Sequence, residues 1–392
     1  MAHITRVKVD GLLGRVDPVV IELDRSTNIF FGENGCGKTT LLKILDSALS
    51  LDASLVAGLP FRKAEVSIFS INEGAVIKHS LEPSEKSARN AVNVARLLAS
   101  STPSEYSAGA DEKMFLDAFR NGARADWKLA PKPKRTPQRW QHSFLPTTRL
   151  YSGEVLPRMG RAQISDLELD KLFNDAISKS WLKFYSVVLT SVREVQEEGL
   201  RKILEEVLAP RSELKIGNDG VDPVSAYKKA RRFLQRQGNG ESIGTAADFR
   251  KRYEDSEELR RVVGNIDEIE SAIEKATAPV DQFLSTITSL FSRKKGLKLV
   301  NNELQVILES GDTLPLSGLS SGEKHIVKIL LAVIGAGPSS VLIDEPELSM
   351  HIDWQRVLVK TLRAVNPNCQ LIFASHSPEV MADVADSSIF RI

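Results

Sequence analysis

The chain has 392 residues, of which 42% are hydrophobic and 26% charged, a composition typical of a folded protein with two or three packed units. Its net charge of +1 excludes a strong overall preference for nucleic acid, so any such binding must be local. The two cysteines exclude a disulfide framework, and neither a signal peptide nor an apolar run of the ~18 residues that a membrane helix needs is present. We therefore expect a cytoplasmic protein without a membrane partner.

The first part of the chain has the pattern of a sheet with one helix. Short strands are predicted at residues 3–9, 18–23, 27–31, 65–71 and 75–81, with a hairpin turn at 72–74. A helix is predicted at 37–49, directly after a glycine-rich loop. Two short helical patterns follow at 84–121, then a proline-rich and basic loop at 130–140 and a strand at 143–151.

The central part of the chain has the pattern of helices. Ser165 and Glu168 form a capping-box pattern before a run with helical spacing, which Pro210 and the turn at 217–220 end. A second helical block is predicted from about 246 to 292, with a break at Pro279. We expect the two blocks to pack as a short antiparallel arm, because a helix of ~40 residues reaches only about 60 Å.

From Lys298 the pattern is again that of a sheet. Strands are predicted at 298–300, 304–309, 341–344, 370–375 and 388–392, and helices at 326–334 and 354–364. The sheet elements therefore lie at the two ends of the sequence, and the helical region is an insertion between them.

Residues 32–39 match the phosphate-binding pattern G-x-x-x-x-G-K-[ST], between a predicted strand and a predicted helix. Such glycines let backbone N–H groups surround a β-phosphate, while Lys38 reaches the β and γ oxygens and the Thr39 hydroxyl binds Mg²⁺. Cys36 stands where the backbone does the binding, so we interpret its side chain as a small filler. The residues predicted to bind the phosphates of ATP are Gly32, Asn34, Gly35, Cys36, Gly37, Lys38, Thr39 and Thr40.

Acidic and imidazole side chains follow two of the later predicted strands. Asp344 ends the strand in VLIDEPE and is predicted to hold Mg²⁺ together with Thr39, while Glu345 is predicted to orient or activate water as a catalytic base. His376 follows the strand at 370–375, at an edge where ligands bind in such sheets, and could donate to the γ-phosphate. Solvated acids at a strand end and a structural histidine are the alternatives. For His351, function and structure stay open.

A second candidate anion site lies at residues 317–325, SGLSSGEKH, just before a helical run. Backbone N–H groups at a helix start attract phosphate. Its candidate residues are Ser320, Ser321, Gly322 and Glu323.

These motifs, in this order, resemble those of the ABC-class ATPases: Walker A in GENGCGKT, the signature in LSSGE, Walker B and the base in VLIDE, and the switch histidine at His376. The resemblance implies an α/β fold, an ABC-type ATPase head with a mixed, mainly parallel sheet and an antiparallel β lobe. The head would comprise residues 1–150 and 297–392, with a helical arm inserted at 151–296. At the position of the family's Q-loop the chain has LPTTR without a glutamine, and Thr147, Thr148 or Arg149 could substitute.

The resemblance also implies the cofactors ATP and Mg²⁺ and a partner. In this family the signature of one subunit closes over the nucleotide of another, which implies a homodimer or a higher homo-oligomer that forms through the ATP site. The helical insert resembles the arm of the SMC, RecF and OLD-like branch. The phrases FGENGCGKTTLLKIL, LSSGEKHIVKIL, IDEPELSMH and FASHSPEVM are most similar to those of OLD-like ATPases of prokaryotic anti-phage systems. Because the chain ends soon after His376, we expect a separate effector protein such as a nuclease, as in PARIS-like systems.

Two alternatives stay open, a RecF-like DNA-repair ATPase and an ATP-gated oligomeric scaffold. Basic clusters could contact the phosphates of a nucleic acid, although charged runs also simply solvate a surface. The clusters are Lys132, Lys134, Arg135 and Arg139 beside Trp127 and Trp140, then Lys228, Lys229, Arg231 and Arg232, and finally Arg293, Lys294 and Lys295.

Overall fold

The computed structural model describes residues 2–82, 127–131, 139–147, 166–208, 222–236, 243–291 and 295–392. These divide into two compact units, Met1–Trp181 with Thr286–Ile392, and Leu182–Ser285. The predicted helices at 84–121, the Ser165 cap, Pro210 and the turn at 217–220 lie outside the described residues. The domain boundaries inferred from the sequence stay predictions.

The first unit is built on a parallel sheet of five strands in the order β13-β3-β12-β11-β7. Every neighbouring pair among them is parallel. The strands β11 and β12 are buried along their whole length, as expected for a parallel sheet that is covered on both faces. The five strands are β3 (Thr27–Phe31), β7 (His142–Leu145), β11 (Ser340–Asp344), β12 (Gln370–Ser375) and β13 (Ile389–Arg391).

The antiparallel lobe predicted for the head is a second five-stranded sheet, in the order β2-β1-β4-β5-β6. Its strands are β1 (Ala2–Asp10), β2 (Val19–Glu22), β4 (Lys63–Ser70), β5 (Ala75–Leu81) and β6 (Lys128–Ala130). The strand β4 alternates between buried and partly exposed residues, because one of its faces covers the core. The sequence did not predict β6, which pairs with β5.

The helix α1 (Lys38–Ser50) shares one hydrophobic core with both sheets. Its buried face includes Leu41, Leu42 and Leu45, which belong to the same cluster as Ile4 of β1 and Ile372 of β12. The phosphate-binding loop at the start of α1 is therefore held by a helix that is packed on both sides.

A buried glutamine joins the two sheets. The Gln370 Nε2 donates to the carbonyl oxygens of Ile4 at 2.6 Å and of Asp24 at 2.8 Å. Its Oε1 accepts from the Ile4 N–H at 2.9 Å and from the Ser340 hydroxyl at 2.8 Å. Because these buried groups satisfy one another, β1 and β12 are fixed together at the start of β12, the strand end opposite the site.

The C-terminal region of the first unit adds a small antiparallel sheet and three helices. The sheet has the order β10-β9-β8, and its hairpin turns at Asn301 and Asn302, which have positive φ angles of 51° and 67°. The elements are β8 (Lys295–Val300), β9 (Glu303–Leu308), β10 (Thr313–Leu314), α8 (Ser321–Gly335), α9 (Ile352–Val365) and α10 (Pro378–Met381).

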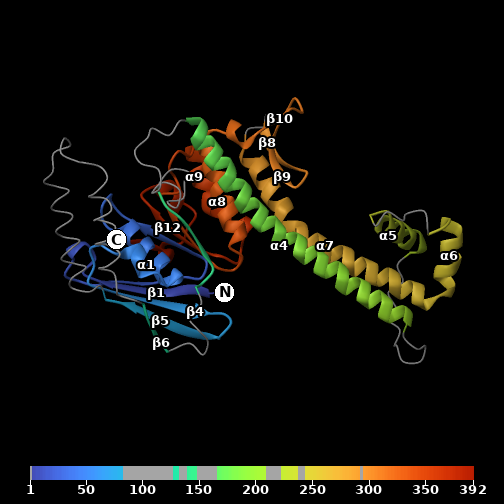
Figure 1. The fold of residues 1–392 in the computed structure, drawn as a ribbon, viewed down its shortest axis with the longest axis horizontal. Helices are drawn as coiled ribbons and strands as arrows, with labels where there is room; N and C mark the ends of the chain where they lie inside the picture. Colours follow the sequence, from blue (N-terminus) through green and yellow to red (C-terminus); the bar gives the residue numbers. More distant parts are fainter. Residues whose placement is uncertain are drawn as a thin grey trace. The chain divides into compact units, whose positions relative to one another are not determined.

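The second unit is helical, as predicted. It contains parts of α4 (Asp166–Leu208) and α7 (Glu257–Leu290), and the whole of α5 (Pro223–Arg236) and α6 (Ala246–Asp255). Within the unit α4 and α7 run side by side and antiparallel, with Lys202 Nζ 3.6 Å from Glu268 Oε2 (Figure 1). Gly199 faces Ile269, where a Cβ would lie 2.3 Å from the isoleucine side chain, so glycine permits the close approach. The sequence did not predict α5.

The predicted break at Pro279 is wrong, because α7 continues through this residue. The second block is instead interrupted at Ser256, between α6 and α7. Its hydroxyl accepts from the Leu259 N–H at 3.1 Å and so begins a new helix. None of the described helices combines the length and the apolar character needed to cross a bilayer.

Candidate active site

The phosphate-binding loop connects β3 to α1. Gly35 and Gly37 have φ angles of 83° and 110°, a left-handed backbone that glycine adopts without strain. Gly37 is the N-cap of α1, so the loop ends where free N–H groups and the helix dipole favour a phosphate. A Cβ at Gly32 would lie 2.8 Å from the Cys36 Sγ, which fits the interpretation of Cys36 as a filler.

Lys38 points into the concave side of this loop. Its ammonium donates to the carbonyl oxygens of Gly32 at 2.8 Å and of Glu33 at 3.0 Å. It also lies 3.9 Å from Glu345 Oε1, and only 5% of the side chain is exposed. A buried cation held by oxygen acceptors alone is suited to bind phosphate oxygens, which are stronger acceptors than carbonyl groups.

Asp344, at the end of β11, faces the start of α1. Its two carboxylate oxygens accept from the Thr39 hydroxyl at 3.0 Å and 2.9 Å. The Thr147 hydroxyl, beyond the end of β7, donates to the same carboxylate. Hydroxyl and carboxylate oxygens are ligands that Mg²⁺ prefers, so Thr39 and Asp344 fit the ion predicted from the sequence. Of the three candidates for the Q-loop position, Thr147 is thus beside the site, whereas Thr148 and Arg149 lie outside the described residues.

Glu345 follows directly but turns its side chain to other partners. Its φ of 52° is left-handed, and its N–H donates to the Ala374 carbonyl at 2.8 Å. The carboxylate contacts His376 Nδ1, and 13% of its side chain is exposed. Burial raises the pKa of Glu345, and the neighbouring Glu347 carboxylate raises it further, against the opposing effects of His376 and Lys38. Such a carboxylate accepts a proton more readily than an exposed one.

Glu347 is a site residue that the sequence did not single out. It is buried, and its Oε1 accepts from the Ser375 hydroxyl at 2.7 Å and from the His376 N–H at 2.9 Å. Among the described residues, Glu345, Glu347 and His376 form the group of acidic and imidazole side chains that could together hold a metal ion. The available signal was the second glutamate of VLIDEPE, two positions after the predicted base.

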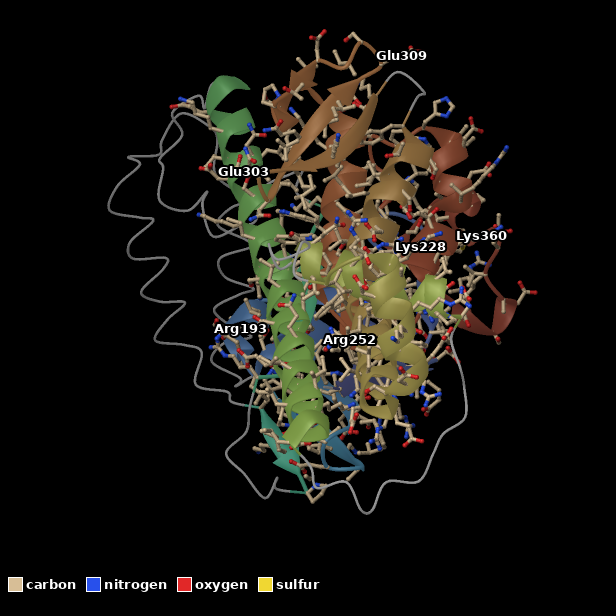
Figure 2. All side chains as sticks on the ribbon, turned by 90° about the vertical axis from the view of Figure 1, so that its right-hand side faces the viewer. Arg193, Lys228, Arg252, Glu303, Glu309 and Lys360 are labelled. Atoms are coloured by element: carbon tan, nitrogen blue, oxygen red, sulfur yellow. The ribbon has the colours of Figure 1, made fainter. Side chains whose placement is uncertain are left out.

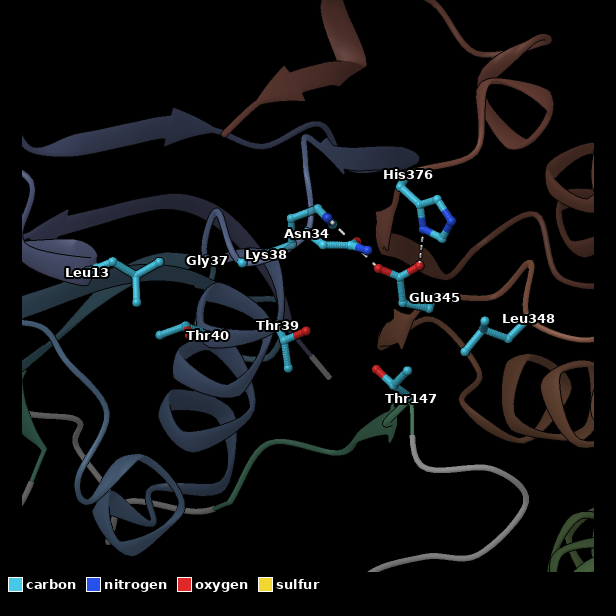
Figure 3. Close-up of a pocket in the computed structure, with 11 residues that line it drawn as sticks. Leu13, Asn34, Gly37, Lys38, Thr39, Thr40, Thr147, Glu345, Leu348 and His376 are labelled. Atoms are coloured by element: carbon cyan, nitrogen blue, oxygen red, sulfur yellow. Dashed lines mark hydrogen bonds and ion pairs between the residues drawn. The ribbon is translucent and has the colours of Figure 1, made fainter. Parts of the chain in front are cut away.

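A cavity of about 480 Å³ lies between these groups (Figure 3). Its walls come from four segments that follow β1, β3, β7 and β11, and from His376 after β12. The carboxyl ends of parallel strands meet here, which is where such sheets bind ligands. The lining residues are Leu13, Asn34, Gly35, Gly37, Lys38, Thr39, Thr40, Thr147, Glu345, Leu348 and His376.

The candidate signature lies at the start of α8 and is not among the residues that line this cavity. Ser320 is the N-cap, and it forms a capping box with Glu323, whose Oε2 accepts from the Ser320 N–H at 2.7 Å. Both Ser320 and Ser321 are exposed, whereas Gly322 is buried. A Cβ at Gly322 would lie 2.5 Å from the Ser349 carbonyl oxygen, so only glycine fits there.

Glu323 is fixed from the other side by Lys295, whose Nζ lies 3.0 Å and 2.9 Å from its two oxygens. Burial acts to raise the pKa of Glu323, but hydrogen bonds from Ser320 and Lys295 outweigh it and hold this pKa below its usual range. Lys295 is thereby engaged inside the protein rather than offered to a nucleic acid.

Other candidate residues have structural contacts or lie outside the described part. His351 is the N-cap of α9 and accepts from the Asp353 N–H at 3.4 Å, away from the cavity. Lys229 pairs with Asp267 at 2.7 Å. Of the candidate basic residues, Lys132, Lys134, Arg135, Arg293 and Lys294 lie outside the described part.

The chain is similar to proteins named as probable ATPases. A family model described as "AAA domain, putative AbiEii toxin, Type IV TA system" matches residues 198–382. The Retron Vc95 probable ATPase of Vibrio cholerae serotype O1 biovar El Tor is 21% identical over 93% of this chain and 68% of its own length. The Retron Ec83 probable ATPase of Escherichia coli is 21% identical over 94% of this chain and 67% of its own length.

Among solved structures, the Smc head domain of Pyrococcus furiosus, with an extended coiled coil and bound to the C-terminal domain of ScpA, aligns with 97% of this chain and 92% of that chain. The identity is 16% and the TM-score is 0.44. The fold is therefore assigned from the strand order given above and not from this similarity. With its phosphate-binding loop, its carboxylates at the strand ends and its similarity to two retron probable ATPases, the chain has the features of an ABC-like P-loop ATPase.

Proposed function

We propose that the protein binds Mg-ATP in the cavity at the carboxyl end of the parallel sheet and hydrolyses it there. The observation that carries this proposal is the convergence of Lys38, Thr39, Glu345 and His376 on one cavity from three different strand ends, with Asp344 bonded to Thr39. Lys38 and the glycine loop would bind the β- and γ-phosphates. Thr39 and Asp344 would hold Mg²⁺, which supplies charge neutralisation at the phosphates when bound.

The partly buried Glu345 and the exposed His376 would act together on the attacking water and the γ-phosphate. Glu345 has the properties of a base, because its pKa is raised and it is held beside the cavity. His376 accommodates this role by contacting the Glu345 carboxylate through Nδ1, which leaves its other ring nitrogen for a phosphate oxygen.

We further propose that the site is completed by the signature of a second copy. Ser320 and Ser321 are exposed at the start of α8 and outside the lining of the cavity, which supports a role toward a neighbouring protomer's nucleotide. Self-association through the ATP site, as a homodimer or a higher oligomer, would then depend on nucleotide.

The biological role that we propose is control of a separate effector, such as a nuclease, in prokaryotic anti-phage defence. The support is the retron association in the names of the two curated relatives, and the toxin system in the description of the family model. ATP binding and hydrolysis would set whether the effector is held or released.

A DNA-binding role is a second candidate, supported by exposed cations on α5. Lys228 lies on the exposed surface of this helix (Figure 2), together with Arg231 and Arg232. Binding of duplex DNA that weakens steeply with salt, and that is lost when these three residues are replaced by glutamine, would favour the repair alternative.

Two variants test the ATPase site directly. In Lys38→Ala the phosphates lose their buried cation, so ATP binding and turnover should fall to background. Glu345→Gln should bind ATP normally, because the amide keeps the shape, but its turnover should fall roughly 100-fold or more because it cannot accept a proton.

The measurements are isothermal titration with ATP and Mg²⁺, and steady-state phosphate release. Glu379→Gln is the matched control, since this glutamate pairs with Arg356 at 2.8 Å, outside the lining of the cavity. Unchanged turnover in either site variant would contradict the assignment of that residue.

A further inference from the structure

We propose that Glu347 is a positioning residue for ATP hydrolysis, which orients His376 through hydrogen bonds to the turn that carries it. The inference rests on the proposed ATPase site and adds a residue to it. Glu347 follows β11, whereas His376 follows β12, so a carboxylate from one strand end fixes the histidine of the next.

One oxygen of Glu347 accepts hydrogen bonds from three polar groups of this turn. Its Oε1 accepts from the Ser375 hydroxyl at 2.7 Å, the His376 N–H at 2.9 Å and the Ser377 N–H at 3.2 Å. The same oxygen lies 3.2 Å from His376 Nδ1. A buried carboxylate thus holds three consecutive residues, and the backbone of His376 can shift little while these bonds persist.

The carboxylate also sets which ring nitrogen of His376 carries hydrogen. Nδ1 contacts Glu345 on one side and lies near Glu347 on the other. Because both partners are acceptors, Nδ1 must be the donor, and Nε2 is left to face the nucleotide. A histidine whose ring is free to rotate would present either nitrogen.

The burial of the Glu347 carboxylate indicates that this side chain does more than fill space. Its side chain is 5% exposed, and its second oxygen, Oε2, has no hydrogen-bond partner among the described residues. An isolated buried carboxylate is costly, so a neutral side chain would be expected at a position that only fills space. The charged group is therefore best explained by what Oε1 holds in place.

The kinetic test compares Glu347→Ala and Glu347→Gln with the wild type. The glutamine keeps an acceptor oxygen, so it should retain most of the activity that the alanine loses. In Glu347→Ala we expect kcat to fall roughly 10- to 100-fold while KM for ATP changes by less than about threefold, as for loss of a hydrogen bond to a charged group. Glu379→Ala, which removes an acid that faces Arg356, is the control and should leave both constants unchanged.

A double-mutant cycle with His376→Ala separates positioning from general destabilisation. If Glu347 acts through His376, Glu347→Ala should reduce kcat by less than about twofold in the His376→Ala background. An equal reduction in both backgrounds, or a rise in KM with kcat unchanged, would overturn the inference. If the alanine variant does not fold, Glu347→Leu, which fills the same space without an acceptor oxygen, takes its place in the cycle with the same two outcomes.

An NMR measurement on wild-type protein is independent of catalysis. With ¹⁵N-labelled histidine at pH 8, the His376 ring, identified by its loss in His376→Asn, should show the Nδ1–H tautomer. The Nε2–H tautomer would overturn the inference. Absence of ATPase activity in a protein with the Nδ1–H tautomer would instead count against the proposed function and leave the geometry intact.

Discussion

Asp344 and Glu345 are neighbours in the sequence but contact different groups. The sequence predicts this division from the alternation of side chains along a strand. The structure shows a second cause, because Glu345 has already left the strand with a φ of 52° and so turns toward His376. A left-handed backbone at a non-glycine residue is strained, and such strain is common at functional sites, where the direction of a side chain matters.

The pH dependence of stability should report His325, a largely buried histidine beside the site. Burial, with a smaller effect of Lys328, lowers the pKa of His325 from its ordinary value of 6.5 to about 4, and its ring contacts the Pro346 carbonyl at 3.1 Å. The unfolded chain therefore binds a proton below pH 6.5 that the folded protein does not bind until about pH 4. Stability is lost as pH falls through this window.

Between pH 7.5 and pH 5 this residue should reduce the free energy of unfolding by about 2 kcal/mol. Urea unfolding of the wild type and of His325→Gln at the two pH values measures the effect. The glutamine can still donate to Pro346 but does not titrate, so the variant should lose about 2 kcal/mol less than the wild type. An equal loss in both proteins would contradict the assignment.

At the scale of the elements, the sequence predicts the parts whose signal is local. The phosphate-binding loop contains glycines with a left-handed backbone, and its motif is recognisable in the sequence. Because this motif connects a strand to a helix, it predicts β3 and α1 directly. The strands β11 and β12 are apolar runs that end in polar residues, and both are confirmed. The antiparallel lobe is confirmed as well, because β4 and β5 alternate about a turn.

Other elements depend on contacts that no local pattern contains. The sequence does not give the order β3-β12-β11, which brings His376 between the loop and the carboxylates. Glu347 was missed for the same reason, since its partners lie on β12. The helix α5 was missed because it is mostly polar. Its short apolar side, with Ala226 and Ala230, is recognisable only once it packs against α6 and α7.

Pro279 supplies a prediction at this scale, because it lies inside a continuous helix. It removes one backbone hydrogen bond and its ring crowds the preceding turn. Pro279→Ala should therefore stabilise the helical unit by roughly 1–3 kcal/mol, and Pro279→Gly should stabilise it less, because glycine is a weaker helix former.

Hydrogen exchange of the amides around residues 275–283 and the urea midpoint measure the change. ATP turnover should be unaffected, since Pro279 is not among the residues that line the cavity. An alanine variant less stable than the wild type would show that the proline is required by packing rather than tolerated.

At the scale of the whole molecule, the central claim is that the cavity of one protomer meets the signature of another. The cavity contains Lys38, Thr39 and Glu345, and it is lined without Ser320 or Ser321. The two serines are exposed at the start of α8. Hydrogen bonds from the Ser320 N–H and from Lys295 to the Glu323 carboxylate hold this helix start in place. An exposed helix start held in this way is suited to receive a phosphate brought by a neighbour.

Complementation between two inactive variants tests this claim most directly. Lys38→Ala cannot hold ATP but offers an intact signature, whereas Ser321→Arg holds ATP but presents a bulky side chain to its partner's nucleotide. Mixed at equal concentration, the two should recover up to roughly a quarter of the wild-type sites, if subunits exchange at random and the sites act independently. Each variant alone, at the same total concentration, is the control.

The measurement is the rate of phosphate release by the mixture, after mass spectrometry has established that the subunits exchange. We expect activity in the mixture that neither variant shows alone. A mixture that stays inactive despite exchange, or a Ser321→Arg protein that is fully active by itself, would contradict it.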